Sequence, residues 1–221
     1  MLHRIQLEIE KILRRNQNGF RKNRSTTGQI LTVRRLIEGI NAKNLQATLL
    51  FVDFTKAFDS IDRGKLEQIL YAYGIPGETI AAIMMLYKHT KAKVRSPDGD
   101  TEFFDVLAGV LQGDTLAPFL FIIALDYILR TTMDINKHLG FTISKTRSRR
   151  HPAVTITDAD YADDLALFSN NCKDAERMLH LLESAAATIG LSVNAGKTEH
   201  ISYNQHGTGT ITGEQIKLVD D

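Results

Sequence analysis

The chain has 221 residues, an apolar content of 43% and a formal net charge of +1, values typical of a globular domain with a substantial core. No run approaches the ~18 consecutive apolar residues of a membrane span, and no secretory signal opens the chain, so we expect a soluble intracellular protein without a membrane partner. The single cysteine, Cys172, excludes an internal disulfide, and with seven scattered histidines it offers no zinc-ligand spacing.

Apolar periodicity predicts alternating helices and strands. A first helix is expected from the start of the chain to Leu13, followed by a polar loop at 17–27. Further helices are expected at 28–42, 65–73, 78–88, 116–132 and 174–189. Strands are expected at 47–54, in hairpins at 92–107 and 153–168, at 198–203 and near the C-terminus. Strands separated by helices, with an antiparallel hairpin among them, indicate an α+β sheet with helices packed on one face.

The most informative segment is Tyr161-Ala-Asp-Asp164, which places two adjacent carboxylates at the tight connection of the second hairpin. Like charges this close are unfavourable unless a positive charge compensates them. A divalent cation could do so, because Mg²⁺ binds one or two carboxylates together with substrate phosphates. The alternative from the residues alone is an ordinary solvated turn.

Asp53 is the candidate for a third carboxylate. It is the one acidic residue in the apolar run 49–54, and a lone charge inside a buried strand would be costly. Asp53 therefore lies at an exposed strand end, is paired, or binds metal. Three such carboxylates would suit a two-metal nucleotidyl transferase or phosphohydrolase.

Five ordered segments together resemble the reverse transcriptases of non-LTR (LINE-type) retrotransposons. They are residues 17–26 (QNGFRKNRST), 51–59 (FVDFTKAFD), 108–118 (AGVLQGDTLAP), 161–164 (YADD) and 190–198 (GLSVNAGKT). The resemblance implies a polymerase palm, an antiparallel sheet with helices on one face, together with partial fingers and no thumb. It places the partial fingers at residues 1–46 and the palm at 47–221, with 64–107 including elements that connect the two. It also implies a catalytic core truncated at both ends. The chain would begin after a family segment that helps to bind the triphosphate, and it would stop before the primer-grip turn.

The resemblance assigns roles to individual residues. Asp53, Asp163 and Asp164 would hold two Mg²⁺ ions, for which Mn²⁺ could substitute, and Lys197 would protonate the departing pyrophosphate. Residues expected to contact nucleotide or template are Phe58 as the steric gate, Gln112, Gly113, Tyr161, Arg21 and Arg24. The implied partners are an RNA template, a DNA primer and dNTPs.

Other charged residues receive plainer interpretations. Asp158 and Asp160 alternate along the strand before the acidic pair and are expected to face solvent. The basic residues between Arg14 and Arg24, and those between Lys145 and Arg150, either neutralise nucleic-acid phosphates or form solvated basic faces.

The leading functional expectation is an RNA-directed DNA polymerase core. Two alternatives stay open. One is an inactive retroelement remnant that binds RNA or DNA, and the other is a reverse transcriptase of the group II intron or retron type.

Overall fold

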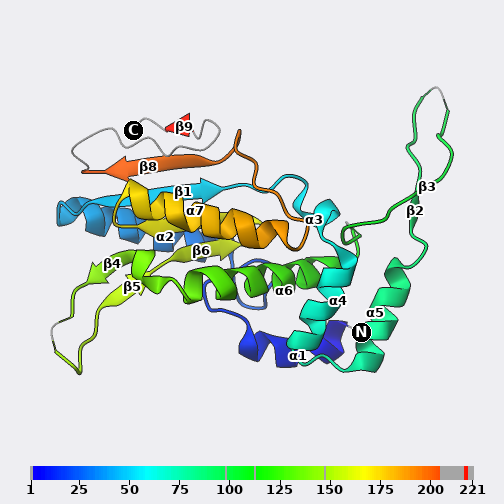
Figure 1. Ribbon diagram of the computed structural model, residues 1–221, viewed down its shortest axis with the longest axis horizontal. Coiled ribbons are helices and arrows are strands. Elements are labelled where there is room, and N and C mark those ends of the chain that lie inside the picture. Colours follow the sequence, from blue (N-terminus) through cyan, green and yellow to red (C-terminus); the bar gives the residue numbers. More distant parts are fainter. Residues whose placement is uncertain (1, 98, 112, 147, 205–216, 219–221) are drawn as a thin grey trace.

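The computed structural model describes residues 2–97, 99–111, 113–146, 148–204 and 217–218. Its centre is a five-stranded sheet in the order β6-β7-β1-β8-β9 (Figure 1). The strands are β1 (Ala47–Val52), β6 (Asp158–Tyr161), β7 (Asp164–Ser169), β8 (Glu199–Tyr203) and β9 (Lys217–Leu218). All neighbouring pairs are antiparallel except β8 and β9.

The central strand β1 is buried almost throughout, as its continuous apolar sequence predicts. Alternate side chains enter two separate cores, because successive residues of a strand point to opposite faces. Leu50 and Val52 contribute to the larger core, and Leu49 packs in the smaller one.

The larger core lies under α6 (Ala117–Leu129) and α7 (Cys172–Ala187). Helix α6 is apolar on all sides and almost wholly buried, whereas α7 is amphipathic and turns its polar side outward. Helices α1 (Leu2–Ile12) and α4 (Arg63–Ala72) complete this side of the molecule. The expected helical cover on one face of the sheet is therefore present.

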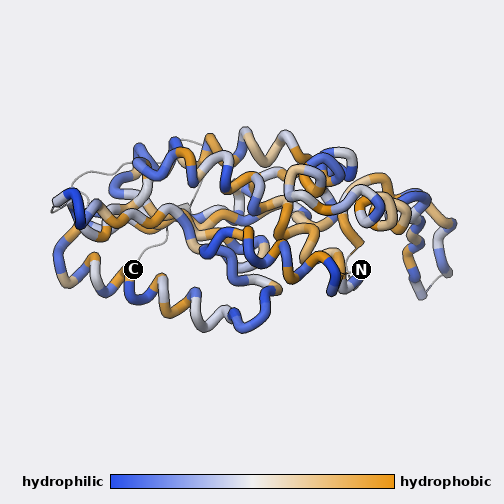
Figure 2. The backbone as a smooth tube through the Cα atoms, turned by 90° about the horizontal axis from the view of Figure 1, so that it is seen from below, coloured by the Kyte–Doolittle hydropathy of each residue, from blue (hydrophilic) through white to orange (hydrophobic). Residues whose placement is uncertain are grey.

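The opposite face of the sheet carries one helix, α2 (Thr26–Ala42), which follows a Ser25 N-cap. Its buried Ile40 packs against Leu49 and Phe168 in the smaller core. In Figure 2 the largely hydrophobic strands form the middle layer, with helices on both sides of it that carry hydrophilic as well as hydrophobic residues. Because α2 covers only part of this face, the sheet remains accessible beside it.

The remaining elements extend from these layers (Figure 1). Helix α3 (Ala57–Ser60), which the sequence did not predict, follows β1, and α5 (Gly77–Tyr87) packs on α4. Two hairpins project outward, formed by β2 (Lys91–Ala92) with β3 (Phe104–Asp105) and by β4 (Phe141–Ser144) with β5 (Val154–Ile156). Among the described residues, no helix is both long enough and apolar enough to cross a bilayer.

Candidate active site

Asp53 follows the last residue of β1 and lies at the end of the sheet, with a side chain 34% exposed. Its backbone carbonyl accepts a hydrogen bond from the Asn194 N–H at 2.8 Å. This bond fastens the end of β1 to the loop between α7 and β8. Of the three sequence alternatives, the structure shows a partly exposed strand end together with a weak ion pair to Lys197.

The acidic pair lies where it was expected, at the turn between β6 and β7. Tyr161 and Asp164 are the last cross-strand partners, and Ala162 and Asp163 form the connection between them. Ala162 has a φ of 56°, in the left-handed region that favours glycine, and its side chain is buried. The turn therefore exposes the carboxylates while its backbone is packed against the protein.

Strand register brings the three carboxylates to one end of the sheet. Val52 pairs with Leu165, so Asp53 and Asp164 are the next residues along these two antiparallel strands. Burial raises the pKa of Asp164 above its usual range, and the negative charges of Asp163 and Asp53 raise it further. The site thus concentrates negative charge more strongly than its surroundings compensate.

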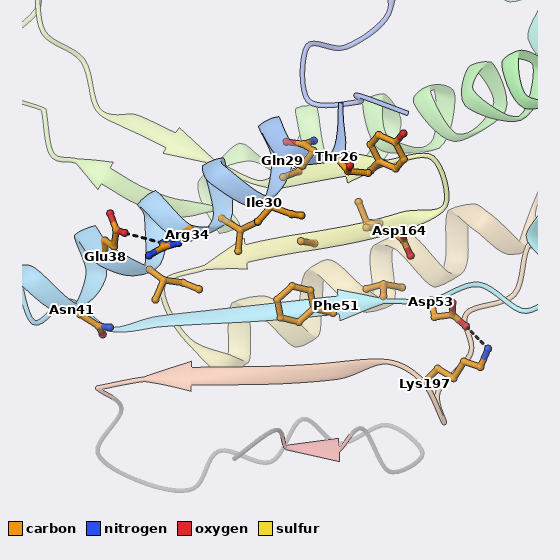
Figure 3. A pocket seen from close by; sticks show the side chains of 17 residues that line it. Thr26, Gln29, Ile30, Arg34, Glu38, Asn41, Phe51, Asp53, Asp164 and Lys197 are labelled. Atoms are coloured by element: carbon orange, nitrogen blue, oxygen red, sulfur yellow. Dashed lines mark hydrogen bonds and ion pairs between the residues drawn. The ribbon is translucent and has the colours of Figure 1, made fainter. Parts of the chain in front are cut away.

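Lys197 supplies one positive charge to this end of the sheet. Its Nζ lies 3.7 Å from Asp53 Oδ2, and the lysine side chain is 72% exposed (Figure 3). The loop 190–198 holds it there, because Thr198 N–H and Lys197 N–H both bond to the Asn194 carbonyl. An ion pair this exposed is weak and salt-sensitive, so it offsets only part of the charge.

A cleft of about 910 Å³ opens beside the carboxylates, between α2 and the uncovered face of the sheet (Figure 3). Its floor is formed by apolar side chains of β1, β6 and β7, including Phe51, Leu165 and Ala166. Ile30, Val33 and Ile37 of α2 form the opposite wall. Asp53, Asp164 and Lys197 line its end, so a ligand lying on the sheet would reach the carboxylates.

The donor chemistry of the site fits a divalent metal ion. Carboxylate oxygens from two strands converge there, and the pKa of Asp164 is raised first by burial and then by the negative charges of Asp163 and Asp53. Among the described residues, no three Asp, Glu, His or Cys side chains already stand close enough together to hold a metal ion. Coordination would therefore require the carboxylates to close around the ion.

Phe58, expected to act as the steric gate, is half-buried in α3. Its ring stacks on Phe121 of α6, with ring centroids 4.5 Å apart, and Phe20 meets it edge-on at 6.4 Å. These contacts fix the orientation of the ring without assigning it a role. Phe20 was not singled out by the sequence.

Residues 109 and 110 are held beside α3 by their backbone. The Val110 N–H donates to the Phe58 carbonyl at 2.7 Å, and a Cβ on Gly109 would lie 2.5 Å from the Asp59 Cα. Gly113 is exposed, with a φ of +96°, and among the described residues other than its chain neighbours no atom lies within 4 Å of where a Cβ would be. Gln112 lies outside the described residues.

The two arginines expected to contact template differ. Arg21 is buried, and its guanidinium donates to Glu10 Oε2 at 2.8 Å and to the carbonyls of Arg14 and Gln17. Because these groups occupy its donors, the Arg21 guanidinium has little left to offer a template phosphate. Arg24 is half-buried and bonds to the Arg15 carbonyl and Asn18 Oδ1.

Asp158 and Asp160 correct the sequence interpretation, because neither faces solvent. Their side chains are fully buried, at 2.6 Å and 3.4 Å from Arg14 nitrogens, and Arg14 itself is only 4% exposed at its side chain. Arg14 is thus neither a phosphate contact nor part of a solvated basic face. The sequence offered no signal for this pairing, since the partners are 144 and 146 residues apart.

The site is also supported by a short segment at the start of the polar loop that was expected at 17–27. Residues 16–19, here called the strap, lie beside the outer edge of β6 and the turn that follows it, and Gln17 and Asp160 form an isolated parallel bridge. Asn18 N–H bonds to the Asp160 carbonyl at 2.9 Å, and Asp160 N–H to the Asn16 carbonyl at 3.2 Å. The strap therefore covers an edge strand that would otherwise expose unpaired backbone groups.

Comparison with known proteins identifies relatives over nearly the whole chain. The model of the family described as reverse transcriptase (RNA-dependent DNA polymerase) matches residues 1–216. The Pol polyprotein of the type-2 retrotransposable element R2DM from Drosophila melanogaster is 29% identical over 147 residues, which are 66% of this chain and 13% of the polyprotein. A Pol polyprotein of a type-1 retrotransposable element R2 from Popillia japonica is 27% identical over 211 residues, which are 94% of this chain and 28% of the relative. The chain thus spans less than a third of either relative.

Solved structures show the same fold. Apo telomerase from Candida tropicalis, truncated from its C-terminal domain, superposes with a TM-score of 0.64 at 13% identity, covering 94% of this chain and 40% of that one. Telomerase from Candida albicans in complex with a TWJ fragment of telomeric RNA gives 0.64 at 12% identity, covering 93% and 34%. At these identities the likeness concerns the fold alone, and it confirms the α+β arrangement of palm and fingers type expected from the sequence.

Proposed function

Because this chain belongs to the reverse transcriptase family, we propose that it is the catalytic core of an RNA-directed DNA polymerase. The observation that carries the proposal is the convergence of Asp53, Asp163 and Asp164 at one end of the sheet, next to a cleft large enough for substrate. In the proposed reaction the 3′-oxygen of a DNA primer forms a bond to the α-phosphorus of a dNTP. The bond to the β-phosphate breaks, and pyrophosphate leaves.

The three carboxylates would hold Mg²⁺, or Mn²⁺ in its place. Bound there, two such ions would neutralise the triphosphate and lower the pKa of the primer hydroxyl. The raised pKa of Asp164 supports this assignment, since crowded carboxylates with little internal compensation favour a cation. Lys197, beside Asp53 and largely exposed, is suited to donate a proton to the departing pyrophosphate.

Other residues would orient the substrates. The sheet face in the cleft would support the primer terminus, with Tyr161 lining its end. The Phe58 ring, held between Phe20 and Phe121, would exclude a ribose 2′-hydroxyl. Gly113 has open space where a Cβ would lie, so template or nucleotide could approach its backbone. Arg24, half-buried and bonded to Arg15 and Asn18, is the arginine candidate for a template phosphate.

Primer extension on an RNA template tests the proposal directly. The chain should add deoxynucleotides in Mg²⁺, and both EDTA and the Asp163→Asn substitution should abolish addition. The variant should keep its fold, because removing one of several like charges relieves repulsion in the metal-free protein. Extension that survives Asp163→Asn would contradict the assignment of the site.

A chain extended at both ends with its native flanking sequence provides the second arm. Positioning supplies much of the rate in phosphoryl transfer, so added primer-binding elements should raise processive synthesis well above that of the 221 residues. Absence of synthesis from both forms would contradict the polymerase proposal.

A further inference from the structure

The metal-binding turn proposed above contains a backbone conformation that needs external support. Ala162 connects Tyr161 to Asp163 with a φ of 56°, a region that residues other than glycine seldom occupy unless their surroundings hold them there. A change of this one dihedral angle would redirect the Asp163 carboxylate. The position of the carboxylate therefore depends on whatever holds Ala162.

Gln17, in the strap, holds both backbone polar groups of Ala162. The Ala162 N–H donates to Gln17 Oε1 at 2.8 Å, and Gln17 Nε2 donates to the Ala162 carbonyl at 3.1 Å. Gln17 is only 2% exposed, so water does not compete with these bonds. One primary amide thus pairs with one residue of the turn as a neighbouring strand would.

The same amide is itself fixed in place. Gln17 Oε1 also accepts the Gly19 N–H at 2.7 Å, and the strap is bonded to β6 on both sides of Asp160. A Cβ on Gly19 would lie 2.2 Å from the Ala162 nitrogen, so only glycine allows the strap to lie this close. Gln29 of α2 adds bonds to the carbonyls of Asn16 and Asp160.

Only a primary amide of this length meets the geometry. The site requires an acceptor for two N–H groups and a donor for one carbonyl on adjacent atoms, and glutamine provides both. A methionine of similar length would leave three buried backbone groups unpaired, and a buried unpaired group is destabilising. The bonds are therefore specific to the turn and are not general packing.

We propose that Gln17 is a positioning residue for the active site: its side-chain amide holds the Ala162 backbone in the left-handed conformation that presents Asp163 to the metal. Gln17 touches neither metal nor substrate and acts through Ala162. The inference rests on the proposed function, because it concerns the same carboxylates. It adds a dependence of metal affinity on a residue 146 positions away from Asp163 along the chain.

The test compares Gln17→Met and Gln17→Asn with wild type. Gln68→Met makes the same chemical change at an exposed position of α4 and serves as the matched control. Mn²⁺ binding is followed by electron paramagnetic resonance, with Asp163→Asn as the reference for loss of the site. Protection of the Ala162 amide is followed by hydrogen exchange in protein labelled with ¹⁵N-alanine, and folding by thermal denaturation.

Gln17→Met should weaken Mn²⁺ binding roughly tenfold, as outer-shell substitutions commonly do, and should speed exchange of the Ala162 amide by a similar factor. Alanine amides of α6 and α7 should keep their protection. Gln17→Asn retains the amide on a shorter side chain and should have the smaller effect on both measurements, which preserves the test should the methionine variant fold poorly. Gln68→Met should match wild type.

Three outcomes would overturn the inference, and they can be distinguished from one another. Mn²⁺ binding that is lost in Asp163→Asn but unchanged in both Gln17 variants would contradict the positioning role and leave the proposed function standing. Mn²⁺ binding unaffected by Asp163→Asn would contradict the proposed function itself. A general loss of amide protection at unchanged Mn²⁺ affinity of the folded fraction would make Gln17 a structural residue only.

Discussion

Two acidic clusters lie within seven residues of one hairpin, and they are treated in opposite ways. Asp158 and Asp160 are fully buried and face the Arg14 guanidinium, whose Nε also bonds to Asp134 at 3.3 Å. Asp163 and Asp164 are more exposed, and among the described residues the positive charge paired with their neighbour Asp53 is that of the exposed Lys197. The protein pairs the first cluster with a buried arginine, whereas the second has little internal compensation and would suit the external cation proposed above. Burial together with a fixed partner separates a structural carboxylate from one available for chemistry.

Removing Arg14 should cause the largest loss of stability among the substitutions considered. Arg14→Met would leave Asp158 and Asp160 buried without a cation, and loss of one partner from a buried ion pair typically costs about 3–5 kcal/mol. Burial, and to a smaller extent repulsion from Asp158, already raises the pKa of Asp160. As pH falls, protonation of Asp160 would therefore remove a buried charge from the variant and reduce its loss of stability. Denaturant unfolding at several pH values should show a loss that shrinks in acid. Arg15→Met, at an exposed neighbour, should stay close to wild type, and an equal loss there would contradict the account.

A glycine pair tests the contact between the strap and the turn. Gly19→Ala would place a Cβ 2.2 Å from the Ala162 nitrogen and should cost about 1–3 kcal/mol, as overpacking usually does. Gly39→Ala, in α2 with no atom within 4 Å, should instead stabilise the protein by roughly 0.5–1 kcal/mol. Melting temperatures of the two variants should therefore move in opposite directions. A shift of the same sign in both would contradict the close approach.

Asp164→Asn tests whether the acidic pair at the end of the sheet destabilises the metal-free protein. The folded state raises the pKa of Asp164, first by burial and then through Asp163 and Asp53, so its stabilising contribution is present at low pH and lost as pH rises through that pKa. The metal-free variant should therefore be more stable than wild type near pH 8, by up to about 1 kcal/mol after solvent screening, and should lose this advantage near pH 4. Mg²⁺ should stabilise wild type alone. A metal-free variant less stable at pH 8 would show that Asp164 is structural.

The smallest change is expected for Lys197→Met. An exposed pair at 3.7 Å contributes a few tenths of a kcal/mol, ~0.3, and salt screens it further. Thermal melts should hardly distinguish the variant from wild type, while the rate of nucleotide addition should fall if Lys197 protonates pyrophosphate. A large thermal loss would place Lys197 with Arg14 among the structural cations.

The sequence predicted the fold wherever a signal was local. Apolar periodicity located α6 and α7, and the continuous run at 47–54 located β1, because each element buries its own pattern of side chains. The short helix α3 was missed, since four residues hold too little periodicity. Motif resemblance singled out Asp53, Asp163 and Asp164 as candidate metal ligands, and the strand register places them at one end of the sheet.

Long-range pairing was the part that the sequence could not predict. Asp158 and Asp160 look like solvent-facing residues of an alternating strand, and Arg14 looks like part of a basic surface. The arginine and the two aspartates can be buried only because their opposite charges pair with one another. Gln17 stood in a recognised motif, but its role depends on a turn 145 residues away. Single-sequence patterns carry no signal for partners at such separations.

The contacts that Arg14 and the strap make with β6 also determine the order in which parts of the chain can fold. Arg14 and Asp158 are separated by 144 residues, so at the usual 5–20 residues per second the ribosome needs roughly 7–30 s to deliver the second partner after the first. During that interval Arg14, Gln17 and Gly19 have no β6 to pack on, while α2 and β1 have already emerged. The N-terminal segment must therefore dock late, after the hairpin of β6 and β7 has formed. A nascent chain arrested before residue 158 would consequently present an N-terminus open to proteases, and the completed chain would protect it.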